Sequence, residues 1–267
     1  MISDVRGVLS VLKVHLYIPE GGSSPRDVLN KRSNVLRYLN EKSARKPELV
    51  DELSISRSTV DRTIRALIGV DCVTETERRY TATKTGRLAL TEYEEYVSTI
   101  DAIQQSAQLL NHLPESANVE PLLLEGALVT LAKPHAPDHA LIPTNQLVEN
   151  ATMMKGLAPV VYRSYLTTLS EQFERDSFDA EIVAETDVIS ALSEFSKTVV
   201  DSFVQHESLS LYRTEEKLPY ALWLMETPTG THAGITVYNS GGVAGTIVSD
   251  SADAVAWARE TYQGYRE

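Results

Sequence analysis

The chain has 267 residues, of which 42% are hydrophobic and 23% are charged, and this composition excludes a disordered or fibrous protein. The single cysteine, Cys72, excludes an internal disulfide and a thiolate metal cluster, and it fits a reducing compartment. The one candidate targeting segment, residues 8–18, is too short to cross a bilayer, so we expect a cytoplasmic protein without a membrane partner.

The net charge of −12 is unevenly distributed along the chain. Residues 26–90 contain 14 Lys and Arg against 9 Asp and Glu, whereas residues 91–267 contain 9 against 26. The length suits two domains, so a compact basic domain is expected to precede a larger acidic one. The acidic excess is typical of a halophilic protein, although a surface that merely maintains solubility explains it as well.

Residues 1–25 are predicted to be an N-terminal extension. They end in a cluster of Pro, Gly and Ser at positions 19–25, which separates them from the helical pattern that follows. We expect that removing this stretch leaves folding and DNA binding intact.

Residues 26–90 have the pattern of a winged helix-turn-helix. A first helix begins near Asp27, a second follows Pro47, and Ser56 can cap a third. The apolar stripes of the three helices are Val28, Leu29, Val35, Leu36 and Leu39; Leu49, Val50 and Leu53; and Val60, Ile64, Leu67 and Ile68. After Gly69 the period changes to two on either side of Glu77-Arg78, which predicts a β-hairpin that forms the wing.

Residues 91–113 are predicted to form a connecting helix. Apolar residues recur along it with the alternating spacing of three and four that is typical of a helix-packing seam. The seam consists of Tyr93, Tyr96, Ile100, Ile103, Ala107 and Leu110. It indicates either a dimer interface or packing within its own domain.

Residues 114–267 predict a mixed α/β regulatory domain, so the whole chain is assigned to the α+β class. Helical patterns cover residues 150–173, 187–206 and 253–265. Strand-like runs cover residues 122–131, 180–184, 209–213, 220–225, 234–238 and 243–248, and Gly241-Gly242 is expected to form a hairpin turn. The two prolines between His135 and His139 favour a rigid loop there over a metal site, so no metal ligand is assigned.

The exposed face of the third predicted helix and the wing carry the candidate DNA-binding residues. A third helix that enters the major groove needs cationic side chains that fork onto guanine or grip phosphate, and small hydroxyls near its N-terminus. The candidates are Ser56, Arg57, Ser58, Thr59, Arg62, Arg65, Arg78 and Arg79. Any one of these arginines could belong to an ordinary solvated face, but their position in the basic part of an acidic chain favours double-stranded DNA as the partner.

The sequence resembles archaeal transcriptional regulators of the FilR type. Residues 33–39 and 46–67 are similar to the winged-helix half of that family, and residues 80–86 to its wing exit. In the C-terminal half, residues 134–137, 218–222 and 249–258 are similar to its regulatory domain. The resemblance covers residues 26–267 and implies a homodimeric, archaeal transcription regulator without implying a known ligand.

The role of residues 114–267 follows less directly from the sequence. Aromatic residues, together with one arginine, could line a pocket for a small-molecule effector, or could simply be core; they are Tyr162, Arg163, Tyr165, Trp223, Tyr238 and Trp257. No catalytic motif is present, so no catalytic residue, cofactor or enzymatic activity is predicted. Two alternatives stay open: a winged-helix protein-interaction module that does not bind DNA, and a DNA-targeted enzyme with an unrecognised site.

Overall fold

The structure is a computed structural model that describes residues 24–175, 177–192, 206–240 and 242–266. The chain divides into two compact units, one that ends at Val97 and one that begins at Ser98. The predicted extension lies almost entirely outside the described residues, because the description begins at Ser24.

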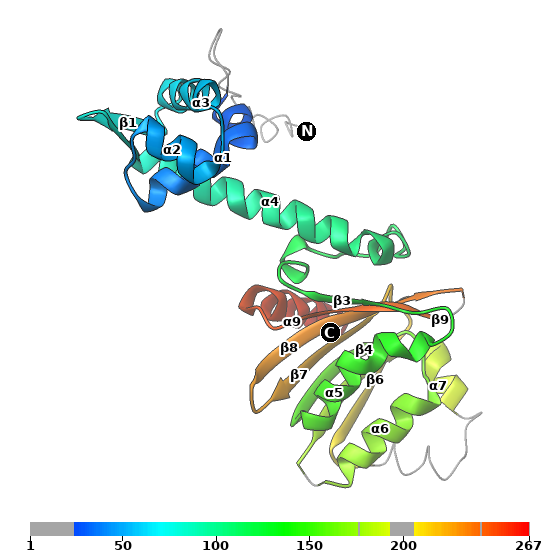
Figure 1. The fold of residues 1–267 in the computed structure, drawn as a ribbon. Coiled ribbons are helices and arrows are strands. Elements are labelled where there is room, and N and C mark those ends of the chain that lie inside the picture. The colour runs from blue at the N-terminus through cyan, green and yellow to red at the C-terminus, as the bar shows by residue number, and fades with distance from the viewer. Residues whose placement is uncertain (1–23, 176, 193–205, 241, 267) are drawn as a thin grey trace, which may run out of the picture. The chain divides into compact units, whose positions relative to one another are not determined.

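The N-terminal unit consists of three helices, a hairpin and the start of a long helix (Figure 1). The helices are α1 (Pro25–Glu41), α2 (Lys46–Leu53) and α3 (Arg57–Gly69); strands β1 (Val73–Thr76) and β2 (Arg79–Ala82) pair antiparallel, and α4 (Lys84–Leu110) follows. This is the element order of a winged helix-turn-helix, as predicted. The long helix starts at Lys84, earlier than the predicted residue 91.

The core of this unit is formed by the predicted apolar stripes, with one exception. Ile68 is 39% exposed, whereas Thr63 is buried on the inner side of α3. The Thr63 hydroxyl accepts a hydrogen bond of 2.8 Å from Nη1 of Arg32 on α1. The inner side of α3 therefore includes a polar contact with α1 that the sequence pattern did not predict.

The C-terminal unit is built on a seven-stranded mixed sheet with the order β3-β9-β8-β7-β4-β5-β6. Strands β4, β5 and β6 are parallel, and all other neighbouring pairs are antiparallel. The strands are β3 (Leu128–Leu131), β4 (Met153–Ala158), β5 (Asp179–Glu185), β6 (Leu209–Thr214), β7 (Ala221–Thr227), β8 (Gly230–Asn239) and β9 (Gly242–Ser249). The helices are η1 (Pro121–Leu123), η2 (Pro137–Leu141), α5 (Ile142–Asn150), α6 (Arg163–Phe173), α7 (Thr186–Leu192) and α9 (Ala252–Arg266).

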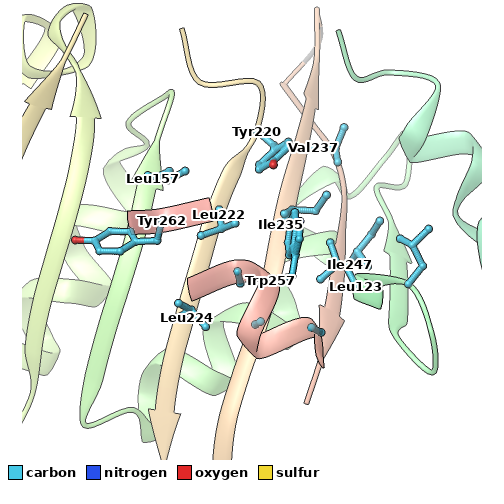
Figure 2. Packing of buried hydrophobic residues seen from close by; sticks show 14 of the residues in the cluster. Leu123, Leu157, Tyr220, Leu222, Leu224, Ile235, Val237, Ile247, Trp257 and Tyr262 are labelled. Atoms are coloured by element: carbon cyan, nitrogen blue, oxygen red, sulfur yellow. The ribbon is translucent and has the colours of Figure 1, made fainter. Parts of the chain in front are cut away.

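Each face of this sheet packs against helices. On one face, Leu222, Ile235 and Ile247 pack with Trp257 and Tyr262 of α9, as Figure 2 shows, and the end of α4 joins this cluster. Helices α5 and α6 cover the opposite face (Figure 1). Both faces of the sheet are covered and apolar. Because successive strand residues point to opposite faces, the strands β7 and β9 have near-continuous apolar runs.

Three predicted elements of this unit differ in the structure. The helical pattern over residues 150–173 is wrong in its first part, which contains β4, and α5 precedes it. In the run 122–131, only Leu128–Leu131 is a strand, because η1 occupies its start. Of the helix predicted over 187–206, Thr186–Leu192 is α7 and residues 193–205 lie outside the described part of the chain.

The predicted seam of α4 does not form one continuous interface. Tyr93 packs on the core of the N-terminal unit, whereas Ile103 and Leu110 pack on the sheet cluster of the C-terminal unit. Between them, Tyr96 is 60% and Ile100 is 45% exposed. The two ends of the seam therefore pack against cores of this chain, and its exposed middle is available to a second molecule.

Candidate nucleic-acid interface

The turn between α2 and α3 gathers three hydroxyls at the N-terminus of α3. Ser54 adopts a left-handed conformation with φ 52°, and this residue ends α2. The Ser56 Oγ accepts a hydrogen bond of 3.2 Å from the Thr59 backbone N–H, which confirms Ser56 as the N-cap. Its Oγ also lies 3.0 Å from the Ser58 Oγ and 2.8 Å from the Thr59 Oγ1. A helix N-terminus with such hydroxyls favours an anion such as a phosphate group.

The predicted arginines lie on the outer side of α3, because Val60, Ile64 and Leu67 bury its inner side. Arg57, Arg62 and Arg65 are all exposed. Arg62 bends back along the helix, where its Nε donates to the Ser58 carbonyl at 3.2 Å. The side chains of Arg57 and Arg65 make no hydrogen bond or salt bridge with any described residue, so their donors are available to a ligand.

One acidic residue also lies on α3, and it is paired. The Asp61 carboxylate is 2.6 Å from Nζ of Lys46 on α2. The hydrogen bond and the charge of Lys46 lower the pKa of Asp61, and the same hydrogen bond raises the pKa of Lys46. This pair neutralises the negative charge that would otherwise lie among the arginines of α3.

The tip of the wing exposes Arg78. Glu77 and Arg78 both adopt left-handed conformations, with φ 51° and 61°, and Thr76 pairs with Arg79 on either side of them. Two left-handed residues between paired strands are the signature of a type I′ hairpin turn. The Arg78 side chain makes no hydrogen bond or salt bridge with any described residue, so it projects from the tip as a single cation.

Arg79 is placed differently from the other candidates, because its guanidinium contacts α2 and the segment before it. Its Nη2 donates to the Ser43 carbonyl at 2.6 Å and to Glu48 at 3.2 Å, and its Nε donates to the Ser43 Oγ at 3.2 Å. The hydrogen bond from the Arg45 backbone N–H and the charge of Arg79 lower the pKa of Glu48. These contacts fasten the wing to the start of α2.

The wing exit residues join the hairpin tightly to α4. The Thr83 Oγ1 donates to the Asp71 carbonyl at 2.6 Å and accepts from the Gly86 N–H at 2.9 Å. A Cβ at Gly86 would lie 2.0 Å from the Cys72 carbonyl oxygen, so only glycine fits there. The threonine and glycine of the predicted wing exit therefore fix where α4 leaves the wing.

The aromatic residues predicted for a ligand pocket do not come together as one set. Tyr165, Trp223 and Tyr238 line a cavity of about 120 Å³ on the α5 and α6 face of the sheet, and Tyr162 stacks on Tyr238. Trp257 lies in the cluster on the opposite face. The side chain of Arg163 lies outside the described residues. Thr144 and Asn145 of α5 also line the cavity, and the sequence analysis missed them because it predicted no helix there.

Metal-binding groups and membrane-crossing helices are both absent from the described residues. No group of three or more His, Cys, Asp or Glu side chains among them is arranged to hold a metal ion. No helix among them has the length and hydropathy that a membrane crossing requires.

The solved structures most relevant to this chain are only remotely similar to it. TrmBL2, described as an archaeal chromatin protein with a novel mode of DNA binding, is 11% identical, covers 90% of this chain and 92% of its own, and gives a TM-score of 0.41. NucT from Helicobacter pylori is 9% identical, covers 52% of this chain and 94% of its own, and gives a TM-score of 0.39. No curated protein matches the sequence.

Two family models match the sequence itself, one in its N-terminal part and one in its C-terminal part, and residues 106–134 lie in neither match. The HVO_A0261 N-terminal domain matches residues 28–105, which include the winged helix and most of α4. The middle domain of methanogenesis regulatory protein FilR1 matches residues 135–267, which contain most of the seven-stranded sheet. The chain therefore belongs to the archaeal transcriptional regulators of the FilR type, with an N-terminal part that matches the HVO_A0261 N-terminal domain and a FilR1 middle domain.

Proposed function

We propose that this regulator recognises a specific promoter sequence by placing α3 in the major groove, with the wing against the backbone or minor groove. The observation that carries the proposal is that Arg57 and Arg65 are exposed on the outer face of α3 and have no hydrogen bond or salt bridge with a described residue. Arg62 can reach base edges after releasing the Ser58 carbonyl, and the hydroxyls of Ser56, Ser58 and Thr59 suit phosphate contacts.

Arg78 and Arg79 have different roles in this proposal. Arg78 reaches DNA from the wing tip, whereas Arg79 acts mainly as a positioning residue because Ser43 and Glu48 occupy its donors. An Arg78→Ala variant should then weaken DNA binding without loosening the wing. An Arg79→Ala variant should loosen the wing as well, which hydrogen exchange of the β1 and β2 amides would detect.

Sequence-specific DNA binding is tested by a fluorescence-anisotropy titration against the DNA upstream of the protein's own gene, repeated over a series of potassium chloride concentrations. The Arg57→Ala/Arg65→Ala variant should bind more weakly and lose sequence preference, and its salt slope should fall by about 0.9 for each of the two arginines that contacts a phosphate rather than a base. The matched control is Arg26→Ala/Lys31→Ala, which removes two exposed charges from α1 and should retain most of the affinity.

A wild-type protein that binds no DNA at any salt concentration would contradict this function and favour the protein-interaction module. Equal loss in both double variants would also contradict the assignment, because it would mean that only net charge matters. Loss of sequence preference confined to the α3 variant would support base reading by that helix.

We further propose that the protein is a homodimer whose contact includes the exposed middle of α4. Tyr96 and Ile100 are four residues apart on one helix, so their side chains are neighbours on its surface. An apolar pair at this exposure is typical of a helix that meets another helix. A dimer would place two copies of α3 in successive major grooves, about one helical turn apart.

The dimer is tested by sedimentation equilibrium of the wild type and of a Tyr96→Ser/Ile100→Ser variant. The variant should sediment as a monomer with unchanged helix content. Leu88→Ser is the control, because Leu88 is also 60% exposed on α4 but lies on a different side of that helix. A monomeric wild type would contradict the proposal.

We propose, finally, that the C-terminal unit is a regulatory rather than a catalytic domain. The match to the FilR1 middle domain supports this role. A signal bound there would act by changing the spacing of the two α3 helices, which is a coupling between two sites and must therefore work in both directions.

A further inference from the structure

The α5 and α6 face of the sheet contains a cavity that results from small residues on adjacent strands. Gly156 and Ala158 of β4, Ala184 of β5 and Ala221 of β7 form its floor. Because these side chains are small, they do not fill the space between the sheet and the helices that cover it. The volume that stays open is about 120 Å³, and helices α5, α6 and α7 supply its walls.

The lining indicates what kind of molecule the cavity can hold. It consists almost wholly of carbon atoms, and none of its described residues is Asp, Glu, Lys, Arg or His. An ionised ligand would lose its hydration there without gaining a partner charge from the described lining, so this lining favours a neutral ligand on energetic grounds. Burial raises the pKa of Tyr165 to about 12, so the phenol at the wall stays neutral too. The occupant must therefore be neutral and mainly hydrocarbon.

Three residues of the lining, Thr144, Trp223 and Tyr238, each have a buried polar side-chain atom without a hydrogen-bond partner among the described residues. Nε1 of Trp223 makes no hydrogen bond, although this residue is only 3% exposed, and Oγ1 of Thr144 makes none at 6% exposure. An indole N–H can only donate, so it requires an acceptor. Leaving a buried donor unsatisfied is costly, and most buried polar groups in proteins have a partner. Less than 1 Å² of each of these atoms is accessible, so a ligand oxygen in the cavity can accept from the indole N–H only if the Trp223 side chain shifts toward it.

We infer that this cavity binds one small, neutral, mainly hydrocarbon molecule that carries a carbonyl-type oxygen, and that the Trp223 side chain shifts on binding so that its N–H donates to that oxygen. Its size is that of a single six-membered ring, because an apolar cavity of about 150 Å³ accepts benzene. That such a molecule is the signal of the regulator rests on the proposed function, whereas the binding site itself does not.

The two tryptophans of the chain make the test specific. Trp223 lines the cavity, and Trp257 lies on the other face of the sheet with an Nε1 that likewise has no partner among the described residues. The indole N–H signals of the full-length protein are recorded by ¹H–¹⁵N NMR during a titration with cyclohexanone, and a Trp257→Phe variant assigns them. The Trp223 signal should move downfield and saturate, while the Trp257 signal stays in place.

Related probes separate the contributions to binding. Methylcyclohexane has the ring but no acceptor and should bind about tenfold more weakly. Cyclohexanecarboxylate is charged at neutral pH and should not shift either indole. Equal shifts of both indoles with cyclohexanone, or no shift at saturating concentration, would overturn the site, and neither result would affect DNA reading.

Variants of the floor provide the matched control. Ala184→Leu fills the cavity and should abolish the Trp223 shift. If it does not fold, Gly156→Ala serves instead, because a Cβ there meets its nearest neighbours at 3.4 and 3.5 Å, which is ordinary contact. Retained cyclohexanone binding in the folded Ala184→Leu variant would overturn the assignment to this cavity.

The regulatory step has its own measurement. Cyclohexanone should change the DNA affinity of the wild type and leave that of Ala184→Leu unchanged. Saturable binding at Trp223 without a change in DNA affinity would support the site and overturn its role as the signal input.

Discussion

Gly86 illustrates how a single residue fixes local geometry in the winged helix. It lies in the first turn of α4, where the Cys72 carbonyl oxygen occupies the position that a side chain would need. The same carbonyl accepts a hydrogen bond of 3.0 Å from the Thr83 N–H. The contact between Cys72, which precedes β1, and the start of α4 therefore requires the absence of a Cβ.

Gly86→Ala should destabilise the N-terminal unit by about 1 to 3 kcal/mol, because the added methyl group forces the backbone apart. Gly69→Ala is the control: it adds the same group at the end of α3, where no atom lies within 4 Å, and should be neutral or slightly stabilising. Urea unfolding gives the stabilities, and hydrogen exchange of the α1 and α3 amides locates the change. Equal effects of both substitutions would contradict this account.

Asp61 provides a test by pH. Its pKa is lowered in the folded protein from an ordinary value of 3.8 because Lys46 donates to it. The contribution of this pair to stability is therefore complete above about pH 4 and is lost as the pH falls through the lowered pKa. An NMR titration of the Asp61 carboxyl carbon should give a value below 3.8, and Lys46→Met should move it upward. An unchanged value in that variant would contradict the pairing.

At the scale of elements, the sequence predicts the winged helix more completely than the sheet domain. Short-range signals determine α1 to α3 and the wing: the cap at Ser56, the apolar stripes and the paired strands around Glu77-Arg78 all act within a few residues. Strand β4 was missed because its run of Met, Lys, Gly, Leu and Ala lacks β-branched residues. It is a strand because β5 and β7 pair with it on both sides, and such long-range pairing leaves no local pattern.

The candidate sites show the same difference. The exposed arginines of α3 could be predicted because the opposite face of that helix is plainly apolar. The contacts of Arg79 could not be predicted, because Ser43 and Glu48 are distant from it in sequence and come near it only in the folded protein. Three aromatic residues of the cavity, Tyr165, Trp223 and Tyr238, were among the candidates, but its floor and the α5 wall could not be predicted, because they depend on small residues from three strands and on a helix whose pattern is weak.

The wing turn is expected to be stabilised by residues that favour left-handed conformations. Glu77→Asn should increase stability by about 0.5 to 1 kcal/mol, since Asn adopts this conformation more readily than Glu, and it leaves Arg78 in place. Arg78→Gly should give a similar gain but weaken DNA binding. Thermal unfolding and DNA titration of both variants separate the two effects, and an unchanged affinity in Arg78→Gly would remove Arg78 from the interface.

For the molecule as a whole, the distribution of charge matters more than its total. Acidic residues outnumber basic ones by 17 over residues 91–267, so the C-terminal part repels itself at low ionic strength. We predict that its melting temperature rises as potassium chloride is raised from 0.1 to about 1 M, where the Debye length falls from about 10 Å to about 3 Å. DNA affinity should fall over the same range. Calorimetry at each salt concentration measures the melting temperature, and a salt-independent melting temperature would contradict a halophilic adaptation.

The topology of the sheet also bears on how the chain is made. Strand β4 needs β7 on one of its sides, yet β7 is synthesised long after β4. During translation, β4 and β5 therefore leave the ribosome with an unpaired edge, whereas the winged helix already has all of its elements. The meander of β7, β8 and β9 forms from contacts between neighbours in sequence, so it can assemble quickly once it emerges. Until then, the nascent middle domain exposes an edge that another chain could pair with, and completion of the last strands removes that hazard.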